Sequence, residues 1–500
     1  MRRLISVLTN RLVIVGLFLL LQIALIVWFI LEFASRWYYL HLTSMIIGFM
    51  ISLYLISDDK NPIFKMTWII FILITPVFGV LLYIYSRTES LSMSSSSRMR
   101  KVQKKRQELL SHEISYPSDE YFKQQKYLMN LNFPVYKNTK SIFLPSGKIK
   151  QQHLLEELKK AEKFIFMEYF IITKSKMWDE ILDVLIEKQQ QGVEIRIMYD
   201  DFGSATKLPY HYHKKLEKLG MKVVRFNPMK LHLNFSMNYR DHRKIVVIDN
   251  KIAFTGGINI GDEYTNKKKV FGYWHDAGIM IEGEAVWSFT ALFLENWIYS
   301  TKKEEKIENY HIKHSVHGNY QYIPFGDIPV DKSLTARSIY LHLINDAKKS
   351  IYITAPYLIL DTEISSALKL AAESGVDVNI IIPAIPDKRL VYMVSESYVQ
   401  ELIPYGVKIY KFSPGFIHSK MIICDEKVAM IGTSNLDFRS LYMHLENNLW
   451  LNDPNTIKDM SEYFKETLNY SKQITKEAIK KRNIIYRVFQ AVLRTFSPLL

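Results

Sequence analysis

The chain has 500 residues, a formal net charge of +15 and a single cysteine, Cys424. One cysteine excludes an intramolecular disulfide and a cysteine-rich zinc site, and the basic balance favours an anionic partner, either nucleic acid or a membrane surface. The length is enough for roughly two to four domains.

Long apolar runs dominate the first 90 residues. Residues 12–33 carry no charge before Glu32, and residues 66–85 carry none; each run is long enough to cross a bilayer. Residues 42–57 form a shorter apolar run, which fits a third span or a re-entrant segment. We therefore predict that residues 1–90 form a multi-pass transmembrane helical anchor with two or three spans.

A serine-rich stretch and a basic cluster follow this anchor. Basic residues just past a span are typical of the cytoplasmic side and can hold anionic lipid headgroups; a solvated charge run is the alternative. We predict a basic linker over residues 91–135 and a cytoplasmic catalytic region. Arg2, Arg3 and Arg11 also favour the cytoplasm, which fits two spans better than three. The cluster consists of Arg98, Arg100, Lys101, Lys104, Lys105 and Arg106.

The rest of the chain is a tandem repeat. Each copy has the pattern strand, helix, strand, helix, strand and hairpin, with helices that end in glycine and strands that are solid apolar runs. We predict a first half at residues 136–310 and a second at 311–470, in a duplicated α/β sandwich whose hairpins meet at one seam. The helix-ending glycines are Gly192, Gly220, Gly375 and Gly406. The matching stretches are 163–172 with 349–359, 179–201 with 362–384, and 212–228 with 398–414.

The two hairpins carry the same polar residues at the same spacing. From histidine through lysine, aspartate and glycine to asparagine, the steps are two, five, seven and three residues in both copies. Residues two apart on a strand point to the same side, so each histidine shares a face with its lysine. The returning strand brings the asparagine back near the histidine. The sets are His242, Lys244, Asp249, Gly256 and Asn259, and His418, Lys420, Asp425, Gly432 and Asn435.

Two such sets suit transfer chemistry at a phosphodiester. One neutral histidine attacks phosphorus and forms a phosphohistidine. The other histidine gives a proton to the leaving oxygen and later removes one from the incoming alcohol. The lysines, with Asn259 and Asn435, hold the non-bridging oxygens. This chemistry requires neither a metal ion nor a cofactor.

Carboxylates complete the predicted site. Each histidine needs its far ring nitrogen held by an acceptor, and Asp276 and Glu446 are the candidates, although both also fit ordinary strand-end carboxylates. Asp249 and Asp425 belong to the repeated motif and are grouped with its catalytic residues. We interpret their role as fixing the hairpin turn rather than touching substrate.

The paired sets resemble the HKD motifs of the phospholipase D superfamily. More closely, the chain resembles the bacterial cardiolipin synthases of the membrane-anchored type over nearly its whole length. It departs from their pattern at Asp241, where asparagine is frequent, and at Met443-His444, which precede Glu446. The segments that carry the resemblance are 61–87, 199–204, 239–264, 354–359, 415–440 and the C-terminal Ser-Pro-Leu-Leu.

This resemblance implies a phospholipase D-like fold and a specific reaction. One phosphatidylglycerol gives its phosphatidyl group to His242 and glycerol leaves; the headgroup hydroxyl of a second phosphatidylglycerol then attacks, giving cardiolipin. The implied partners are phosphatidylglycerol and cardiolipin in the cell membrane, and neither nucleic acid nor a nucleotide is expected. The resemblance implies no oligomeric state.

Three other functions also fit the motifs. In a phospholipase D-type hydrolase, water would resolve the phosphohistidine. A membrane-tethered phosphodiesterase or nuclease would agree with the net charge of +15. The third alternative is an inactive scaffold that binds anionic lipid. Both motifs are complete, which argues against this alternative.

The last 30 residues carry apolar side chains at helical spacing between basic flanks. We predict a basic amphipathic C-terminal helix over residues 471–500. It would lie on the membrane surface or pack on the second half. Upstream, Tyr264 and the Tyr273-Trp274-His275 stretch fit either a lipid-facing rim or ordinary core.

Overall fold

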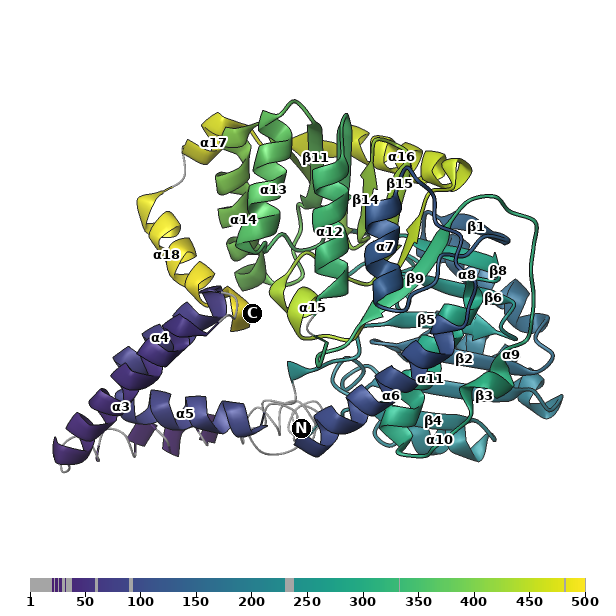
Figure 1. Cartoon of the computed structure of the whole chain (residues 1–500), viewed down its shortest axis with the longest axis horizontal. Helices are drawn as coiled ribbons and strands as arrows, with labels where there is room; N and C mark the ends of the chain where they lie inside the picture. Colours follow the sequence, from purple (N-terminus) through teal and green to yellow (C-terminus); the bar gives the residue numbers. More distant parts are fainter. Residues whose placement is uncertain are drawn as a thin grey trace.

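The computed structural model describes residues 38–58, 62–89, 93–229, 238–331, 333–480 and 483–499, with scattered residues between 20 and 32. Figure 1 shows a body of two α/β halves and a group of N-terminal helices that projects from it. The predicted span at 12–33 lies largely outside the described residues. Arg2, Arg3 and Arg11 lie outside them entirely.

The N-terminal helices are α3 (Tyr38–Ser57), α4 (Pro62–Ile74) and α5 (Pro76–Glu89). The prediction of one continuous span over 66–85 is wrong, because α4 ends before Pro76 and α5 begins with it. Proline lacks an amide hydrogen and disfavours helical backbone at the residue before it. Within the described part of the chain, no helix is both long enough and apolar enough to span a bilayer.

The expected linker at 91–135 is mostly helical: α6 spans Met93–Ser111 and α7 spans Phe122–Asn130. Helix α6 packs against α11 (Val286–Thr301) of the first half. Its Arg106 is buried, pairs with Glu295 at 2.5 Å and lies 4.5 Å from the ring centre of Phe133. Arg106 therefore cannot hold a lipid headgroup, and the interpretation of this segment as a linker is wrong.

Each half contains one mixed sheet, and the two sheets have equivalent strand orders. The first runs β1-β8-β6-β5-β2-β3-β4, and the second runs β9-β16-β15-β14-β10-β11-β12 with β17 added at its edge. The predicted duplication of an α/β unit is confirmed by this match. The strands of the first sheet are β1 (Thr139–Leu144), β2 (Phe164–Tyr169), β3 (Glu194–Asp200), β4 (Lys222–Phe226), β5 (Lys244–Ile248), β6 (Ile252–Gly256) and β8 (Gly278–Gly283). Those of the second are β9 (Tyr322–Asp327), β10 (Ser350–Thr354), β11 (Asp377–Pro383), β12 (Lys408–Phe412), β14 (Met421–Cys424), β15 (Val428–Gly432), β16 (Glu446–Leu451) and β17 (Ser471–Gln473).

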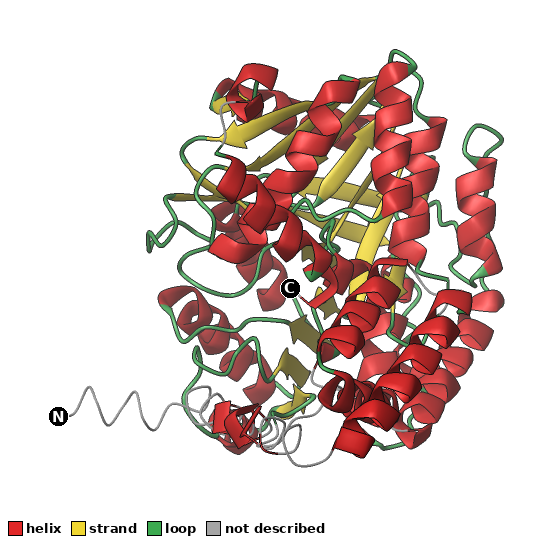
Figure 2. Ribbon diagram, turned by 90° about the vertical axis from the view of Figure 1, so that its left-hand side faces the viewer, coloured by secondary structure: helices red, strands yellow, loops and turns green. Residues whose placement is uncertain are grey.

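Helices cover both faces of the sheets (Figure 2). Equivalent helices begin and end by the same local chemistry: side-chain oxygens of Ser175 and Asp361 cap α9 and α13. Gly192 and Gly375 follow these helices with φ of 88° and 92°, a conformation that favours glycine. The remaining helices are α8 (Gly147–Lys159), α9 (Lys176–Gln190), α10 (Tyr212–Lys218), α12 (Thr335–Asp346), α13 (Thr362–Glu373), α14 (Arg389–Leu402), α15 (Phe438–Tyr442) and α16 (Pro454–Asn469).

The halves are joined by exchanged contacts. The helix after the last strand of each half packs against the first strand of the other half: α11 against β9, and α16 against β1. A small parallel pair, β7 (Tyr273–His275) with β13 (Gly415–Ile417), also links them. The seam between the halves is therefore a shared hydrophobic core, which fixes the hairpins of both sheets relative to one another.

The C-terminal segment is not one helix. It contains β17, the short α17 (Lys476–Lys480), α18 (Ile484–Thr495) and a final 3-10 turn, Ser497–Leu499. Helix α18 packs against α14 of the second half and also contacts α4. The prediction of a single helix over 471–500 is wrong, although α18 is the amphipathic part of it.

Candidate active site

The motif hairpins hold each histidine and lysine at the end of a central strand. His242 precedes β5, and Lys244 is the first residue of that strand, which pairs with β2 and β6 inside the sheet. Asp249 and Asn250 turn the chain with φ of 52° and 55°, as the two central residues of a type I′ turn require. In the second half, Asp425-Glu426 repeats the turn.

The motif aspartates lie at the far end of these strands. The carboxylate of Asp249 accepts hydrogen bonds from the amides of Glu162, Lys163 and Phe164 at 2.7 to 2.8 Å. Asp425 does the same for the three residues that lead into β10: Lys348, Lys349 and Ser350. Neither aspartate lines the pocket described below. Their geometry is that of a clamp between the hairpin and the neighbouring strand.

Asp276 and Glu446 hold the histidines, and they do so across the seam. His242 Nδ1 lies 2.9 and 3.1 Å from the two carboxylate oxygens of Glu446, and His418 Nδ1 lies 2.7 Å from Asp276 Oδ2. Each histidine of one half is thus held by the carboxylate of the other half. All four side chains are buried.

Backbone hydrogen bonds lock this exchange. The His242 amide donates to the Leu445 carbonyl at 2.9 Å, and the His418 amide donates to the His275 carbonyl at 2.7 Å. Leu445 and His275 are the residues immediately before the two carboxylates. Registration of the backbone across the seam therefore places each carboxylate beside the opposite histidine.

The two carboxylates differ in their electrostatic surroundings. Burial opposes ionisation of Asp276, but attraction to His418 and a hydrogen bond from it bring the pKa of Asp276 below its ordinary value. Burial raises the pKa of Glu446 to about 8, against the effect of Lys244. Thr433 and Ser440 also donate their hydroxyl groups to Glu446, Ser440 at 2.7 Å. Hydrogen bonds to a carboxylate favour its charged form.

Both histidines are neutral in the free protein at pH 7. Burial and the charge of Lys244 hold the pKa of His242 well below its ordinary value. Burial, followed by the charge of Lys420, lowers the pKa of His418 to about 4, although Asp276 opposes this. A neutral imidazole has an unprotonated nitrogen, which can attack phosphorus.

The two motif lysines form a buried cationic centre beneath the histidines. Lys244 Nζ donates to the His242 carbonyl at 2.7 Å, and Lys420 Nζ donates to the His418 carbonyl. Burial lowers the pKa of Lys244 to about 7, with a further contribution from Lys420, and lowers that of Lys420 to about 8. A bound anion would favour the charged form of both lysines.

The histidines open into one pocket of about 280 Å³. Asn259 lines it and donates to the Tyr264 hydroxyl at 2.8 Å, and Asn435 lines it from the second half. Aromatic rings surround the histidines: Tyr264, Trp274 and Phe416 lie with ring centres 5.4 to 5.9 Å from His418, and Phe170 lies 5.0 Å from His242. The site thus combines cations with apolar walls.

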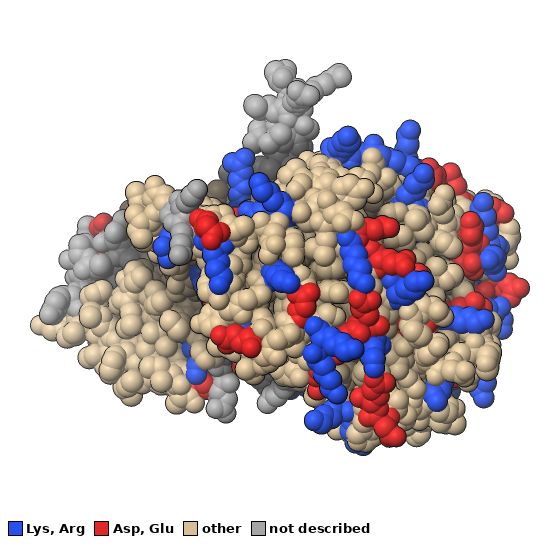
Figure 3. Space-filling model, turned by 90° about the horizontal axis from the view of Figure 1, so that it is seen from above, with Lys and Arg blue, Asp and Glu red and all other residues tan. Residues whose placement is uncertain are grey.

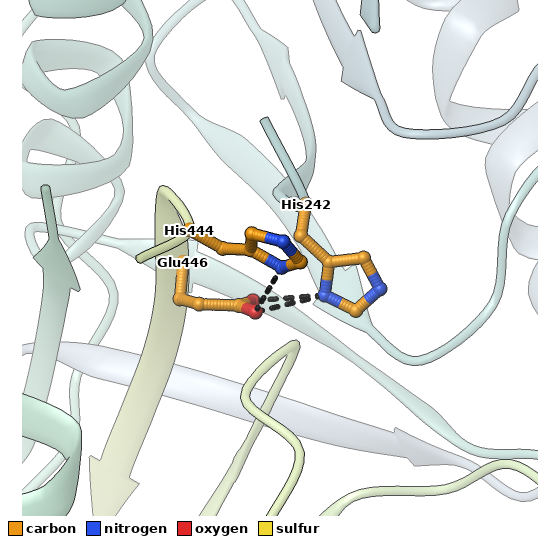
Figure 4. A group of neighbouring side chains, drawn as sticks. All are labelled: His242, His444 and Glu446. Carbon is orange, nitrogen blue, oxygen red and sulfur yellow. Dashed lines mark hydrogen bonds and ion pairs between the residues drawn. The ribbon is translucent and has the colours of Figure 1, made fainter. Parts of the chain in front are cut away.

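A third histidine, His444, was not predicted as a site residue. Its ring centre lies 5.8 Å from that of His242, and its Nδ1 lies 3.9 Å from a Glu446 oxygen (Figure 4). Both ring nitrogens are buried without a hydrogen-bond partner among the described residues. Burial, with Arg439 and Arg240, holds the pKa of His444 well below its ordinary value. The sequence signal was the departure at Met443-His444.

His242, His444 and Glu446 place three ligand atoms within 4.8 Å of one another, close enough in principle for a metal ion. The chemistry around them favours an anion instead. The positive charge of Lys244 acts on His242, and the charges of Arg439 and Arg240 act on His444. Glu446 also already accepts hydrogen bonds from two hydroxyl groups. The absence of a metal requirement stays a prediction.

Comparisons with known proteins agree with this architecture. The crystal structure of a phosphatidylserine synthase from Haemophilus influenzae matches with a TM-score of 0.58, covering 76% of this chain and 100% of that chain, at 14% identity. This likeness shows the fold. Two related α/β halves with a histidine–lysine set in each define a protein of the phospholipase D class.

The sequence comparisons identify the family. The family model described as "Cardiolipin synthase, PLD-like domain" matches residues 154–293 and 340–468. "Cardiolipin synthase 2" of Bacillus anthracis is 37% identical over 477 residues, covering 91% of this chain and 90% of that protein. An "Uncharacterized protein" of Streptococcus mutans serotype c is 41% identical over 462 residues, covering 90% of this chain and 99% of that protein. The chain belongs to the cardiolipin synthase family.

Proposed function

We propose that this protein transfers a phosphatidyl group between two molecules of phosphatidylglycerol, giving cardiolipin and glycerol. The observation that carries the proposal is the exchanged site: His242 and His418 line one pocket, and each is held by a carboxylate of the opposite half. Neither half alone has a complete histidine–carboxylate pair. Family membership supplies the substrate class.

In the first step, neutral His242 attacks the phosphorus of one phosphatidylglycerol. The bond from phosphorus to the glycerol oxygen breaks, and His418 donates its proton to that oxygen, so that glycerol leaves. His418 is neutral in the free protein, so the bound phosphodiester must raise its pKa, as a nearby negative charge does. Asp276 stabilises the resulting imidazolium from behind.

In the second step, His418 removes the proton from a headgroup hydroxyl of the second phosphatidylglycerol. The freed oxygen attacks phosphorus, the bond from phosphorus to the His242 nitrogen breaks, and cardiolipin forms. Lys244 and Lys420, with Asn259 and Asn435, stabilise the charge on the non-bridging oxygens in both steps. The bonds made and broken are of the same type, so the reaction is close to thermoneutral and reversible.

Selection of an alcohol over water follows from the pocket walls. The aromatic rings around His418 make its surroundings largely apolar and so keep few mobile waters there, whereas a lipid headgroup is held beside His418 by the rest of its molecule. The phosphohistidine does not record which alcohol left, so any well-placed hydroxyl group can resolve it.

The same proposal places the protein at the cell membrane, with residues 1–90 as its anchor and the catalytic halves in the cytoplasm. It is supported by the apolar run at 12–33 and by exposed apolar side chains of α3, including Ile46, Phe49 and Met50. Resistance of the membrane-bound protein to alkaline extraction would support it. Release of the protein by alkaline carbonate would contradict it.

The test uses purified protein and vesicles of phosphatidylglycerol alone. Cardiolipin and glycerol should appear together, and His242→Ala and His418→Ala should each abolish turnover because the two histidines act as one unit. Lys458→Ala, a change at an exposed position on α16, is the matched control. Phosphatidic acid as the main product would instead identify a hydrolase. A phosphatidyl adduct mapped to His418 would reverse the roles of the histidines.

A further inference from the structure

Helix α18 is attached to the second half by its polar side. Gln490 is buried, donates to the Met393 carbonyl at 2.9 Å and accepts from Gln400 at 2.8 Å. Tyr486 donates to Glu396 at 2.9 Å, and Arg494 pairs with Glu401. Positions 486, 490 and 494 are four residues apart and form one stripe, which faces α14.

The opposite side of α18 is apolar and exposed. Ile484, Ile485, Val488, Phe489 and Val492 are 67, 74, 58, 47 and 51% exposed. This polarity is the reverse of that of a surface helix in a water-soluble domain, which turns its apolar stripe inward. Five large apolar side chains on one continuous face indicate a surface that contacts another apolar phase or molecule, whereas single exposed apolar side chains would carry no such meaning.

The end of α18 reaches the catalytic pocket. Thr67 of α4 donates to the Thr495 carbonyl at 2.8 Å, and Ser497, two residues further on, is buried and lines the pocket. Phe64 of α4 packs edge-to-face on Phe438, which also lines the pocket. Figure 1 shows α4 and α18 converging beside α15 and the C-terminus.

We propose that α18 lies in the surface of a lipid bilayer, with its apolar face among the headgroups and upper acyl chains, and holds the pocket mouth at that surface. The proposal rests on the proposed function in taking a lipid as substrate. Twelve residues are too few to cross a membrane but suffice for a helix lying in its plane.

A bilayer fits this face better than a protein partner does, because exposed apolar side chains continue onto α4, which contacts α18, and onto α3, which packs against α4. Leu73 and Ile74 of α4 are exposed, as are many side chains of α3. Figure 3 shows charged side chains spread over the catalytic halves and few at the end of the molecule that carries the N-terminal helices. Exposed Arg487 on α18 suits anionic headgroups.

A site-specific label tests this placement in the full-length protein. Cys424 is buried, so a cysteine introduced by Val488→Cys can be labelled selectively with an environment-sensitive fluorophore. Ile142→Cys on β1, an exposed apolar position at the other end of the molecule, is the matched control. With phosphatidylglycerol vesicles that contain spin-labelled lipid, the label at position 488 should be quenched and the label at 142 should not. Equal quenching at the two positions, or none at 488, would overturn the proposal.

Activity provides a second, independent reading. Val488→Asp should lower the ratio of turnover on vesicles to turnover on detergent-dispersed phosphatidylglycerol about tenfold, since loss of one apolar contact with the bilayer is worth at least that factor. Ile142→Asp should leave the ratio unchanged. An unchanged ratio for Val488→Asp would contradict the role of α18. Failure of the unmodified protein to make cardiolipin in either assay would instead contradict the proposed function, because quenching does not depend on turnover.

Discussion

The Asp276→Asn substitution tests whether catalysis depends on Asp276, which holds His418. Asp249, the aspartate that gives the motif its name, serves as the comparison. Asp276 is buried, lies 2.7 Å from His418 Nδ1 and also accepts a hydrogen bond from the Ala277 amide. Asp249→Asn is the matched change: it also neutralises a buried motif-region aspartate, but one that clamps the backbone before β2.

The size of the effect follows from the charge that is lost. Two unit charges about 4 Å apart near a protein site attract by about 4 kcal/mol at an effective dielectric constant of about 20. The Asp276→Asn substitution would remove that attraction from the His418 imidazolium, which corresponds to about 10³-fold in kcat. Asp276 does not line the pocket, so KM for phosphatidylglycerol should change little.

The assay is initial-rate cardiolipin synthesis across pH, with thermal unfolding measured on the same samples. Asp276→Asn should lower kcat and also lower the apparent pKa of His418, because the carboxylate raises it in the unmodified protein. Asp249→Asn should lower the unfolding temperature and leave kcat of the folded protein close to normal, because three backbone amides lose a charged acceptor.

The reverse pattern would exchange the roles of the two aspartates. If Asp249→Asn lost most of its kcat while remaining folded, the motif aspartate would act in the chemistry. If Asp276→Asn kept normal kcat and an unshifted pH profile, the exchanged carboxylate would be a structural feature only.

Three further predictions address charge, packing and metal dependence. First, kcat/KM should fall as pH rises through about 7 to 8. Lys244 and Lys420 lie behind the pocket lining and attract the phosphate through their positive charge, which is present below their lowered pKa values and lost above them. A profile flat to pH 10 would contradict this. Second, Arg106→Ala should destabilise the first half by about 1.5 to 3 kcal/mol, because Glu295 loses its partner at 2.5 Å and keeps only the longer pair with Arg243 at 3.8 Å. Chemical unfolding measures this change, and a value below about 1 kcal/mol would show that α6 is a loose linker. Third, activity should survive strong chelation, and loss of synthesis with EDTA that a divalent ion restores would contradict a mechanism based on lysines.

The repeat made the fold accessible to sequence reasoning. Two copies of one pattern constrain each other, so helices, strands and hairpins could be assigned by comparison. Gly192 and Gly375 predicted the ends of equivalent helices, and both have positive φ. The hairpin turns at Asp249 and Asp425 were predicted on the same grounds.

Contacts across the seam could not be predicted in the same way. The sequence singled out Asp276 and Glu446 as acceptors, but not that each serves the histidine of the other half. That pairing depends on how the halves dock, which local patterns do not encode. His444 was missed for the same reason, because its neighbour His242 is 202 residues away in the sequence.

Two errors near the N-terminus had visible signals. Pro76 lies inside the apolar run at 66–85, and its backbone chemistry divides the run into two helices. In α6, the basic charge obscured a buried stripe of Met99, Val102, Arg106 and Leu110, spaced as one helix face. Overall hydropathy obscures a proline in the first segment, and overall charge obscures a mostly apolar stripe in the second.

We propose that an alcohol, rather than water, resolves a phosphatidyl-histidine formed at the seam. The most direct measurement supplies cardiolipin vesicles to the purified protein and follows products as glycerol is raised. Glycerol should drive cardiolipin back to phosphatidylglycerol on the same enzyme. The ratio of phosphatidylglycerol to phosphatidic acid should rise with glycerol concentration, and His242→Ala should form neither product. One phosphatidic acid formed for each phosphatidylglycerol at every glycerol concentration would show that water resolves the intermediate and that the protein is a hydrolase.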